Sequence, residues 1–167
     1  GAMFRAVAWK LGPQALEMPE RQLERELANL RFELSGPGAE SRLYVDGQPL
    51  TDEIRTEEIG MLASQLAALQ VVREELKRAQ QQIGASTSLV VEGRDMGSVV
   101  FPDARFKFFL DAMAEERARR RCEQLRSWGQ KADLDVILER IRKRDEQDRN
   151  RSIAPLKPAE DALVVDT

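Results

Sequence analysis

The sequence predicts an α/β protein in which a parallel sheet is covered by helices. Three apolar runs without polar alternation indicate strands buried on both faces, as in parallel sheets. These runs are residues 88–91, 106–110 and 162–165. Helical periodicity over residues 114–127 and 134–150 supplies the crossover that the last two strands need in order to run parallel.

Further helices are expected earlier in the chain, where apolar residues recur at helical spacing. They span residues 2–11, 19–30, 57–69 and 71–83. Gly12-Pro13 is a usual terminator, so we expect the first helix to end there, and Gly84 marks the end of the last.

A small antiparallel sheet is expected between these helices. Residues 32–34 and 43–45 alternate apolar and polar side chains, and Asp46-Gly47 follows as a tight-turn signal. The pattern predicts a core of residues 1–30 and 88–167, with an insertion of residues 31–87.

Composition excludes several function classes. The 167 residues include no histidine and one cysteine, Cys122, which removes an imidazole base, excludes an internal disulfide and disfavours a zinc site. No apolar run approaches the roughly 20 residues of a membrane helix and no export signal is visible, so we expect a cytoplasmic protein without a membrane partner. The net charge of −3 argues against a nucleic-acid partner, while arginines concentrated over residues 117–151 suit a small anionic ligand.

The turn after residues 88–91 carries a first candidate site. In a parallel sheet, ligands bind beyond the carboxyl ends of the strands, and Arg94 and Asp95 lie there between two glycines. Arg94 could hold a phosphate, and Asp95 could accept hydrogen bonds from a base or sugar. The alternative is a turn in which the two side chains are merely exposed or paired with each other, and the local sequence favours neither interpretation.

The helix over residues 134–150 changes character along one face. Its apolar stripe leads into Arg144, Asp145 and Asp148, with Arg151 on the flank. Asp148 lies four residues after Arg144 and three before Arg151, so it can order both guanidinium groups. Ordered arginines in a cleft neutralise charge in phosphoryl transfer, whereas the alternative is a surface ladder of ion pairs.

The helix over residues 114–127 carries arginines on the sides away from its apolar face. Arg119, Arg120 and Arg121 could clamp a nucleotide triphosphate from a mobile lid, with Trp128-Gly129 in its turn. The alternative is a solvated basic face, which the local sequence alone favours.

Ordered motifs along essentially the whole chain point to one family. They are Gly1-Ala2-Met3-Phe4-Arg5, Glu53-Ile54-Arg55-Thr56, Ala63-Ser64-Gln65, Gly93-Arg94-Asp95-Met96-Gly97, Val99-Val100-Phe101-Pro102-Asp103-Ala104, Phe109-Leu110-Asp111-Ala112, Glu115-Glu116-Arg117-Ala118-Arg119-Arg120 and Arg144-Asp145-Glu146-Gln147-Asp148-Arg149-Asn150-Arg151-Ser152. In content and spacing these motifs resemble the bacterial cytidylate kinases, which are nucleoside monophosphate kinases.

The resemblance implies transfer of the γ-phosphoryl group of ATP, with Mg²⁺, to CMP or dCMP. It implies a P-loop-kinase-like monomer with a nucleoside-monophosphate-binding insertion and a short lid over about residues 120–133. The catalytic residues would be Arg94, Arg120 and Arg144. Cytosine would be held by Ser64, Arg73 and Asp95, the acceptor phosphate by Arg5, Arg94 and Arg144, the sugar by Asp148 and Arg151, and the ATP phosphates by Arg120 and Arg121.

The sequence departs from the family pattern in its phosphate loop. No Gly-x-x-x-x-Gly-Lys-Ser/Thr motif occurs in the 167 residues, so we expect a chain truncated at both ends that lacks this loop and the first core strands. Phe4 also stands where tyrosine is commoner. The alternatives are a kinase for another nucleoside monophosphate, or an inactive nucleotide- or RNA-binding fragment.

Overall fold

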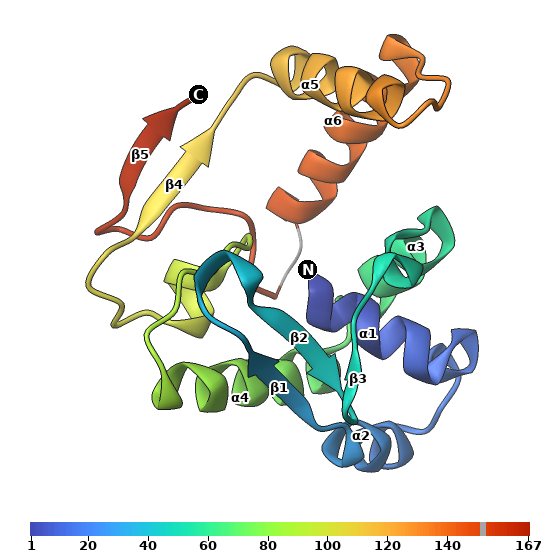
Figure 1. The fold of residues 1–167 in the computed structure, drawn as a ribbon, viewed down its shortest axis with the longest axis vertical. Helices are drawn as coiled ribbons and strands as arrows, with labels where there is room; N and C mark the ends of the chain where they lie inside the picture. Colours follow the sequence, from blue (N-terminus) through green and yellow to red (C-terminus); the bar gives the residue numbers. More distant parts are fainter. Residues whose placement is uncertain (151–152) are drawn as a thin grey trace. The chain divides into compact units, whose positions relative to one another are not determined.

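The first unit of the structure, Gly1–Val91, is built by helices that bury the apolar positions of the sequence. The computed structural model describes residues 1–150 and 153–167. One core joins the helices, because Val7, Leu23, Leu66 and Leu76 are each at most 2% exposed and belong to four different helices. These helices, shown from blue to green in Figure 1, are α1 (Ala2–Leu11), α2 (Glu20–Asn29), α3 (Glu57–Leu66) and α4 (Gln70–Ser86).

A small antiparallel sheet completes this unit, as predicted. Its strands, in spatial order, are β1 (Phe32–Ser35), β2 (Arg42–Val45) and β3 (Gln48–Pro49). Asp46 and Gly47 both have positive φ, 52° and 74°, which is the backbone of a two-residue hairpin turn between β2 and β3. Single turns of 3₁₀ helix at Pro13–Leu16, Gly38–Glu40 and Asp52–Arg55 connect the other elements.

Two helix ends differ from the predictions. α1 ends at Leu11 as expected, because Gly12 adopts a φ of 65° that breaks the helix. α4 runs past Gly84 to Ser86, since a glycine inside a helix costs only about 1 kcal/mol and does not by itself terminate it. α3 ends at Leu66, three residues before the predicted end at Leu69.

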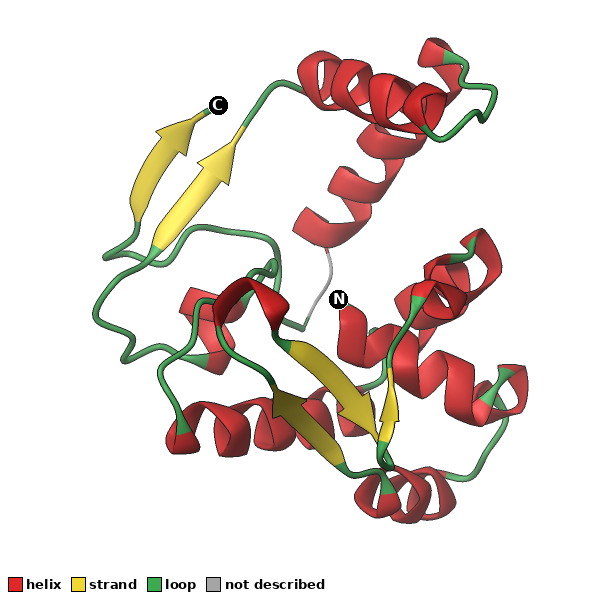
Figure 2. Cartoon of the chain, viewed as in Figure 1, coloured by secondary structure: helices red, strands yellow, loops and turns green. Residues whose placement is uncertain are grey.

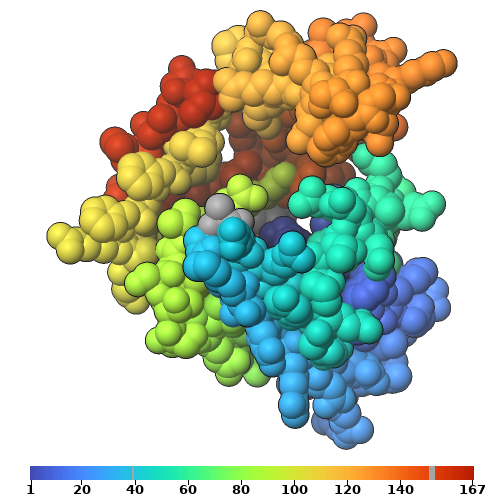
Figure 3. Space-filling view, in the orientation of Figure 1, coloured from blue at the N-terminus to red at the C-terminus, as the bar shows by residue number. Residues whose placement is uncertain are grey.

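The second unit, Glu92–Thr167, combines a parallel strand pair with two packed helices (Figure 2). Its elements are β4 (Phe108–Asp111), α5 (Ala114–Ser127), α6 (Leu134–Asn150) and β5 (Leu163–Asp166), with one π-helical turn at Met96–Val100. The strands pair in parallel, as predicted, with Asp111 opposite Asp166, so both carboxyl ends lie at one edge. Ala118, Cys122 and Ile137 are buried between α5 and α6, which form one continuous mass of side chains, yellow to orange, in Figure 3.

Two expectations about the strands are wrong. Residues 88–91 form no strand in the described structure, where they have no hydrogen-bonded strand partner. The outer side chains of the strand pair are not buried either, since Phe108 is 63%, Leu110 69% and Leu163 61% exposed. An apolar run indicates that a segment can be buried, but burial and strand formation also require a neighbouring element that covers the segment and pairs with it.

The packing divides the chain at a different place from the predicted functional division. Helices α1 and α2 share their core with the helices of residues 31–87 and belong to the same compact unit. The division into core and acceptor-binding insertion therefore stays a prediction about function.

The helices of both units are amphipathic. α6, for example, buries Ile137 while most of its other side chains are charged or exposed. Among residues 1–150 and 153–167, no helix combines the length and the apolar character that a membrane crossing requires.

Candidate functional site

The second unit brings Arg94 and Asp148 together in an ion pair, although they are far apart in the sequence. Arg94 lies in the turn before Met96–Val100, and Asp148 lies on the charged half of α6. Both side chains are largely withdrawn from solvent, with 34% and 14% exposure. The sequence predicted Arg144 and Arg151 as the partners of Asp148, and the structure adds Arg94, which helical spacing could not reveal.

Asp95, next to Arg94, is a buried carboxylate. The whole residue is only 7% exposed. Its backbone carbonyl accepts hydrogen bonds from the amides of Val99 and Val100, at 2.9 and 3.2 Å, so the turn that follows fixes its position. The alternative of a merely exposed turn is therefore wrong, because Asp95 is buried and Arg94 pairs with Asp148.

A second ion pair, between Arg117 of α5 and Asp145 of α6, lies one turn away on α6. Both terminal nitrogens of Arg117 donate to the Asp145 carboxylate, Nη1 at 3.0 Å, and its Nε donates to the carbonyl oxygen of Ala112 at 3.0 Å. The hydrogen bonds from Arg117 are the main reason that the pKa of Asp145 lies below its ordinary value of 3.8. Helical spacing predicts only that Arg117 faces away from the apolar side of its helix, so this role could not be read from the sequence.

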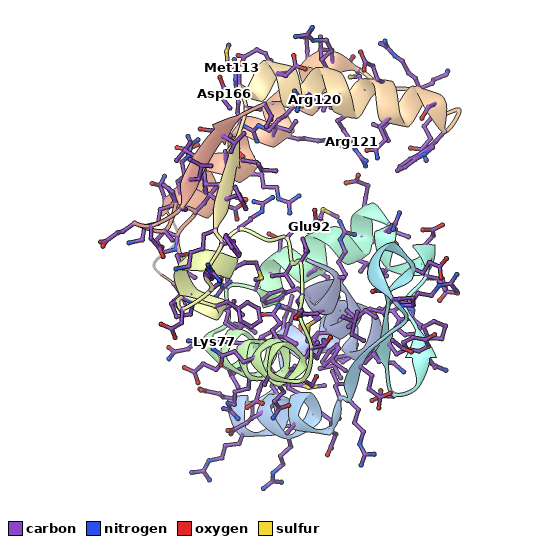
Figure 4. All side chains as sticks on the ribbon, turned by 60° about the vertical axis from the view of Figure 1, so that its left-hand side comes forward. Lys77, Glu92, Met113, Arg120, Arg121 and Asp166 are labelled. Carbon is purple, nitrogen blue, oxygen red and sulfur yellow. The ribbon has the colours of Figure 1, made fainter. Side chains whose placement is uncertain are left out.

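The side chains of Arg120 and Arg121, the predicted ATP-binding residues, project from α5 into different environments (Figure 4). Arg120 donates to Glu116 at 3.0 Å and to the hydroxyl of Thr167 at 3.3 Å, which places it beside the carboxyl end of β5. Arg121 donates to Gln124 at 2.6 Å, and its guanidinium carbon lies 5.6 Å from the centre of the Trp128 ring. Arg120 is thus the better placed of the two for a ligand at this strand edge.

A hollow of about 680 Å³ lies at the same edge of the strand pair. The carboxyl ends of both strands line it, together with the first turn of α5 and the charged half of α6. Arg117, Arg142 and Arg149 face it beside Asp111 and Asp166, so it offers cations and carboxylates to one ligand. Ligands of parallel α/β sheets bind at such an edge.

Arg5 is held by the backbone in the first unit. Its Nη1 donates to the carbonyl oxygens of Ile54 and Thr56, at 2.8 and 3.1 Å, which places the guanidinium at the beginning of α3. A side chain at Gly60 would come within 2.8 Å of Arg5 Nη2, so this glycine leaves room for the guanidinium.

Arg73 and Ser64 belong to the same unit. Arg73 donates to the carbonyl oxygen of Ala67 at 3.2 Å, and its guanidinium carbon lies 5.7 Å from the centre of the Phe4 ring. Phe4 thus supports Arg73 through a cation–π contact, a role that its missing hydroxyl does not affect. Ser64 lies exposed on α3.

The structure distributes the predicted site residues over the two units. Arg5, Ser64 and Arg73 belong to the first, whereas the second contains Arg94, Asp95, Arg120, Arg121, Arg144 and Asp148. Arg151 lies outside the described residues.

Comparison with known proteins relates the entire chain to one family. The family model for cytidylate kinase matches residues 1–167. A cytidylate kinase of Oleidesulfovibrio alaskensis is 56% identical over 167 residues, which cover 100% of this chain and 76% of the relative. That of Nitratidesulfovibrio vulgaris Hildenborough is 58% identical over 100% of this chain and 72% of its own length. One from Pseudomonas aeruginosa PAO1 is 43% identical over 170 residues, covering 100% of this chain and 74% of the relative.

Proposed function

Since this chain belongs to the cytidylate kinase family, we propose that it transfers the γ-phosphoryl group of ATP to CMP or dCMP. The observation that supports this most is the charged half of α6, where Asp148 holds Arg94 in an ion pair one turn from Arg144. An arginine held by a carboxylate keeps its guanidinium in one orientation. Arg94, held in this way, and Arg144 on the same half of α6 are two cations suited to an acceptor phosphate in this proposal.

The chemistry that these residues perform is charge neutralisation. In phosphoryl transfer, negative charge is spread over the equatorial oxygens of the transferred group, and the protein contributes mainly by positioning and by cations. Arg94, Arg144 and Arg5 hold the acceptor phosphate in this proposal, while Arg120, with Arg121, contacts the phosphates of ATP. No histidine base is needed, because catalysis here is mainly positioning and charge neutralisation.

Preference for cytosine follows from the buried carboxylate of Asp95. The edge of cytosine presents an amino group, a hydrogen-bond donor, where uracil presents a carbonyl oxygen. A buried carboxylate requires donors, so it favours cytosine and repels uracil. Ser64 and Arg73 complete the base site in this proposal, and Asp148 with Arg151 binds the sugar.

Magnesium would reach the protein with ATP. Among residues 1–150 and 153–167, no group of three or more acidic or cysteine side chains is placed to hold a metal ion. Magnesium in kinases is held largely by nucleotide phosphates and water, which is consistent with that composition of the site.

The finer organisation belongs to the same proposal. Residues 31–87 would hold the acceptor nucleotide, and residues 120–133, which include the turn at Trp128 and Gly129, would act as a short lid. We propose a cytoplasmic monomer that requires neither nucleic acid nor membrane.

A substrate panel tests the proposed function. The full-length protein is incubated with ATP, magnesium and CMP, dCMP, UMP or AMP in turn, and the diphosphate products are separated by chromatography. We expect CMP and dCMP to be phosphorylated at far higher kcat/KM than UMP or AMP. Formation of ADP from AMP and ATP as the fastest reaction would assign the protein to another nucleoside monophosphate, and no product from any acceptor would refute the kinase.

A further inference from the structure

Arg117 connects three elements of the second unit through a single guanidinium group. Its Nε donates to the carbonyl oxygen of Ala112, the residue directly after β4, at 3.0 Å. Its two terminal nitrogens donate side by side to the carboxylate of Asp145 on α6. Bidentate pairs of this kind fix orientation as well as distance. The carboxyl end of β4, the first turns of α5 and the charged half of α6 are therefore held in one arrangement.

The arrangement also affects the proposed acceptor site, because α6 carries residues of both. Asp145 directly follows Arg144 and lies three residues before Asp148, on the same face of the helix. A rotation of α6 by one residue turns a side chain by about 100° and would separate Asp148 from Arg94. Whatever fixes the rotation of α6 at Asp145 therefore also fixes the ion pair at Asp148.

Charge gives Arg117 a second effect. Arg94 and Arg149 are both close enough to stabilise the negative charge of Asp145, which contributes to the lowered pKa of that carboxyl after the larger effect of Arg117. Without Arg117, a largely buried carboxylate, 15% exposed, would be left without its bidentate partner near Arg94. A buried charge that has lost its partner is destabilising, so the nearby cations Arg149 and Arg94 would be drawn toward it. Asp145 would then compete with Asp148 for Arg94.

We propose that Arg117 and Asp145 are positioning residues for phosphoryl transfer. Arg117 fixes the rotation of α6, and as the ion-pair partner of Asp145 it prevents Asp145 from pairing with Arg94, so that Arg94 stays paired with Asp148. The proposal rests on the proposed function and adds to it two residues that act by holding α6 and, through it, the Arg94–Asp148 pair. It predicts that part of the activity lost on removing Arg117 is lost because the Asp145 carboxylate remains.

The test is a double-mutant cycle in the full-length protein, with kcat and the KM for CMP measured separately. Arg117→Ala is expected to lower kcat/KM by up to roughly 10²-fold, as misplacement by about 1 Å does in other enzymes. Arg117→Ala/Asp145→Ala is expected to recover part of that loss, because the competing carboxylate is gone. Arg140→Ala is the matched control, since Arg140 is an exposed arginine of α6 that does not line the hollow, and it should retain activity.

Melting temperatures separate positioning from folding. If Arg117→Ala melts below the assay temperature, Arg117→Gln repeats the cycle with a smaller change. Wild-type kinetics in the Arg117 variant would overturn the proposal, and so would equal losses in the single and double variants, which would indicate a purely structural pair. If wild-type protein formed no CDP, the proposed function would fail instead, so the two failures are distinguishable.

Discussion

At the scale of single residues, Asp95 has the environment that bears most directly on substrate choice. The residue is 7% exposed, and its backbone carbonyl accepts the hydrogen bonds with which the turn at Met96–Val100 begins. A hydrogen bond to a charged group contributes about 1.5–3 kcal/mol, and a carboxylate can only accept. A base whose edge presents a donor therefore gains from this position, and one that presents an acceptor loses.

We predict that Asp95→Asn weakens the discrimination between CMP and UMP. The amide can donate as well as accept, so the ratio of kcat/KM for the two substrates should fall at least about tenfold. Asp103→Asn, at an exposed aspartate of the same unit, serves as the control and should keep the wild-type ratio. An unchanged ratio in a folded Asp95 variant would show that this carboxylate does not contact the base.

At the scale of elements, α5 and α6 are joined by a small apolar core and by ion pairs at its margin. Ala118, Cys122 and Ile137 form the buried part, and the Arg117–Asp145 pair lies beyond it toward the strand ends. Because the hydrogen bonds from Arg117 lower the pKa of Asp145, the ionised carboxyl is stabilised more in the folded than in the unfolded protein. This contribution is complete above the ordinary pKa of 3.8 and is lost as the pH falls through the lower folded value.

The pH dependence of stability provides a prediction for this pair. Asp145→Asn should be less stable than wild type at neutral pH, and the difference in the free energy of unfolding should shrink as the pH falls below about 4, where the unfolded carboxyl becomes protonated. Urea unfolding of both proteins at a series of pH values measures it. A difference that stayed constant across that range would mean that the Asp145 charge contributes nothing to the stability of the folded state.

The helices were the more predictable elements, and the reason is local. The bounds of α5 and α6 follow from apolar spacing alone, since a helix satisfies its backbone hydrogen bonds within its own residues. Residues 88–91 have the composition of a strand but no pairing neighbour in the described structure, and the exposed Phe108 and Leu110 have the same cause: what covers or pairs a strand is not encoded in its own residues.

At the scale of the whole molecule, the sequence predicted the kinds of site residue better than their partners. The charged half of α6 was predicted because Arg144, Asp145 and Asp148 continue one helical stripe. Their partners Arg94 and Arg117 were not, because they come from elements remote in the sequence and only the fold brings them to α6. Local spacing shows which face is charged, whereas tertiary packing decides which charges meet.

The central claim is that the charged half of α6 neutralises the transferred phosphoryl group, and turnover of Arg144→Ala tests it most directly. Lys143→Ala, at the exposed neighbouring position on the same helix, is the matched control. We expect Arg144→Ala to lose roughly 10²–10³-fold in kcat with ATP and CMP, the effect of removing one group that stabilises transition-state charge, while its melting temperature stays near that of Lys143→Ala. Wild-type turnover in a folded Arg144→Ala protein would contradict the account.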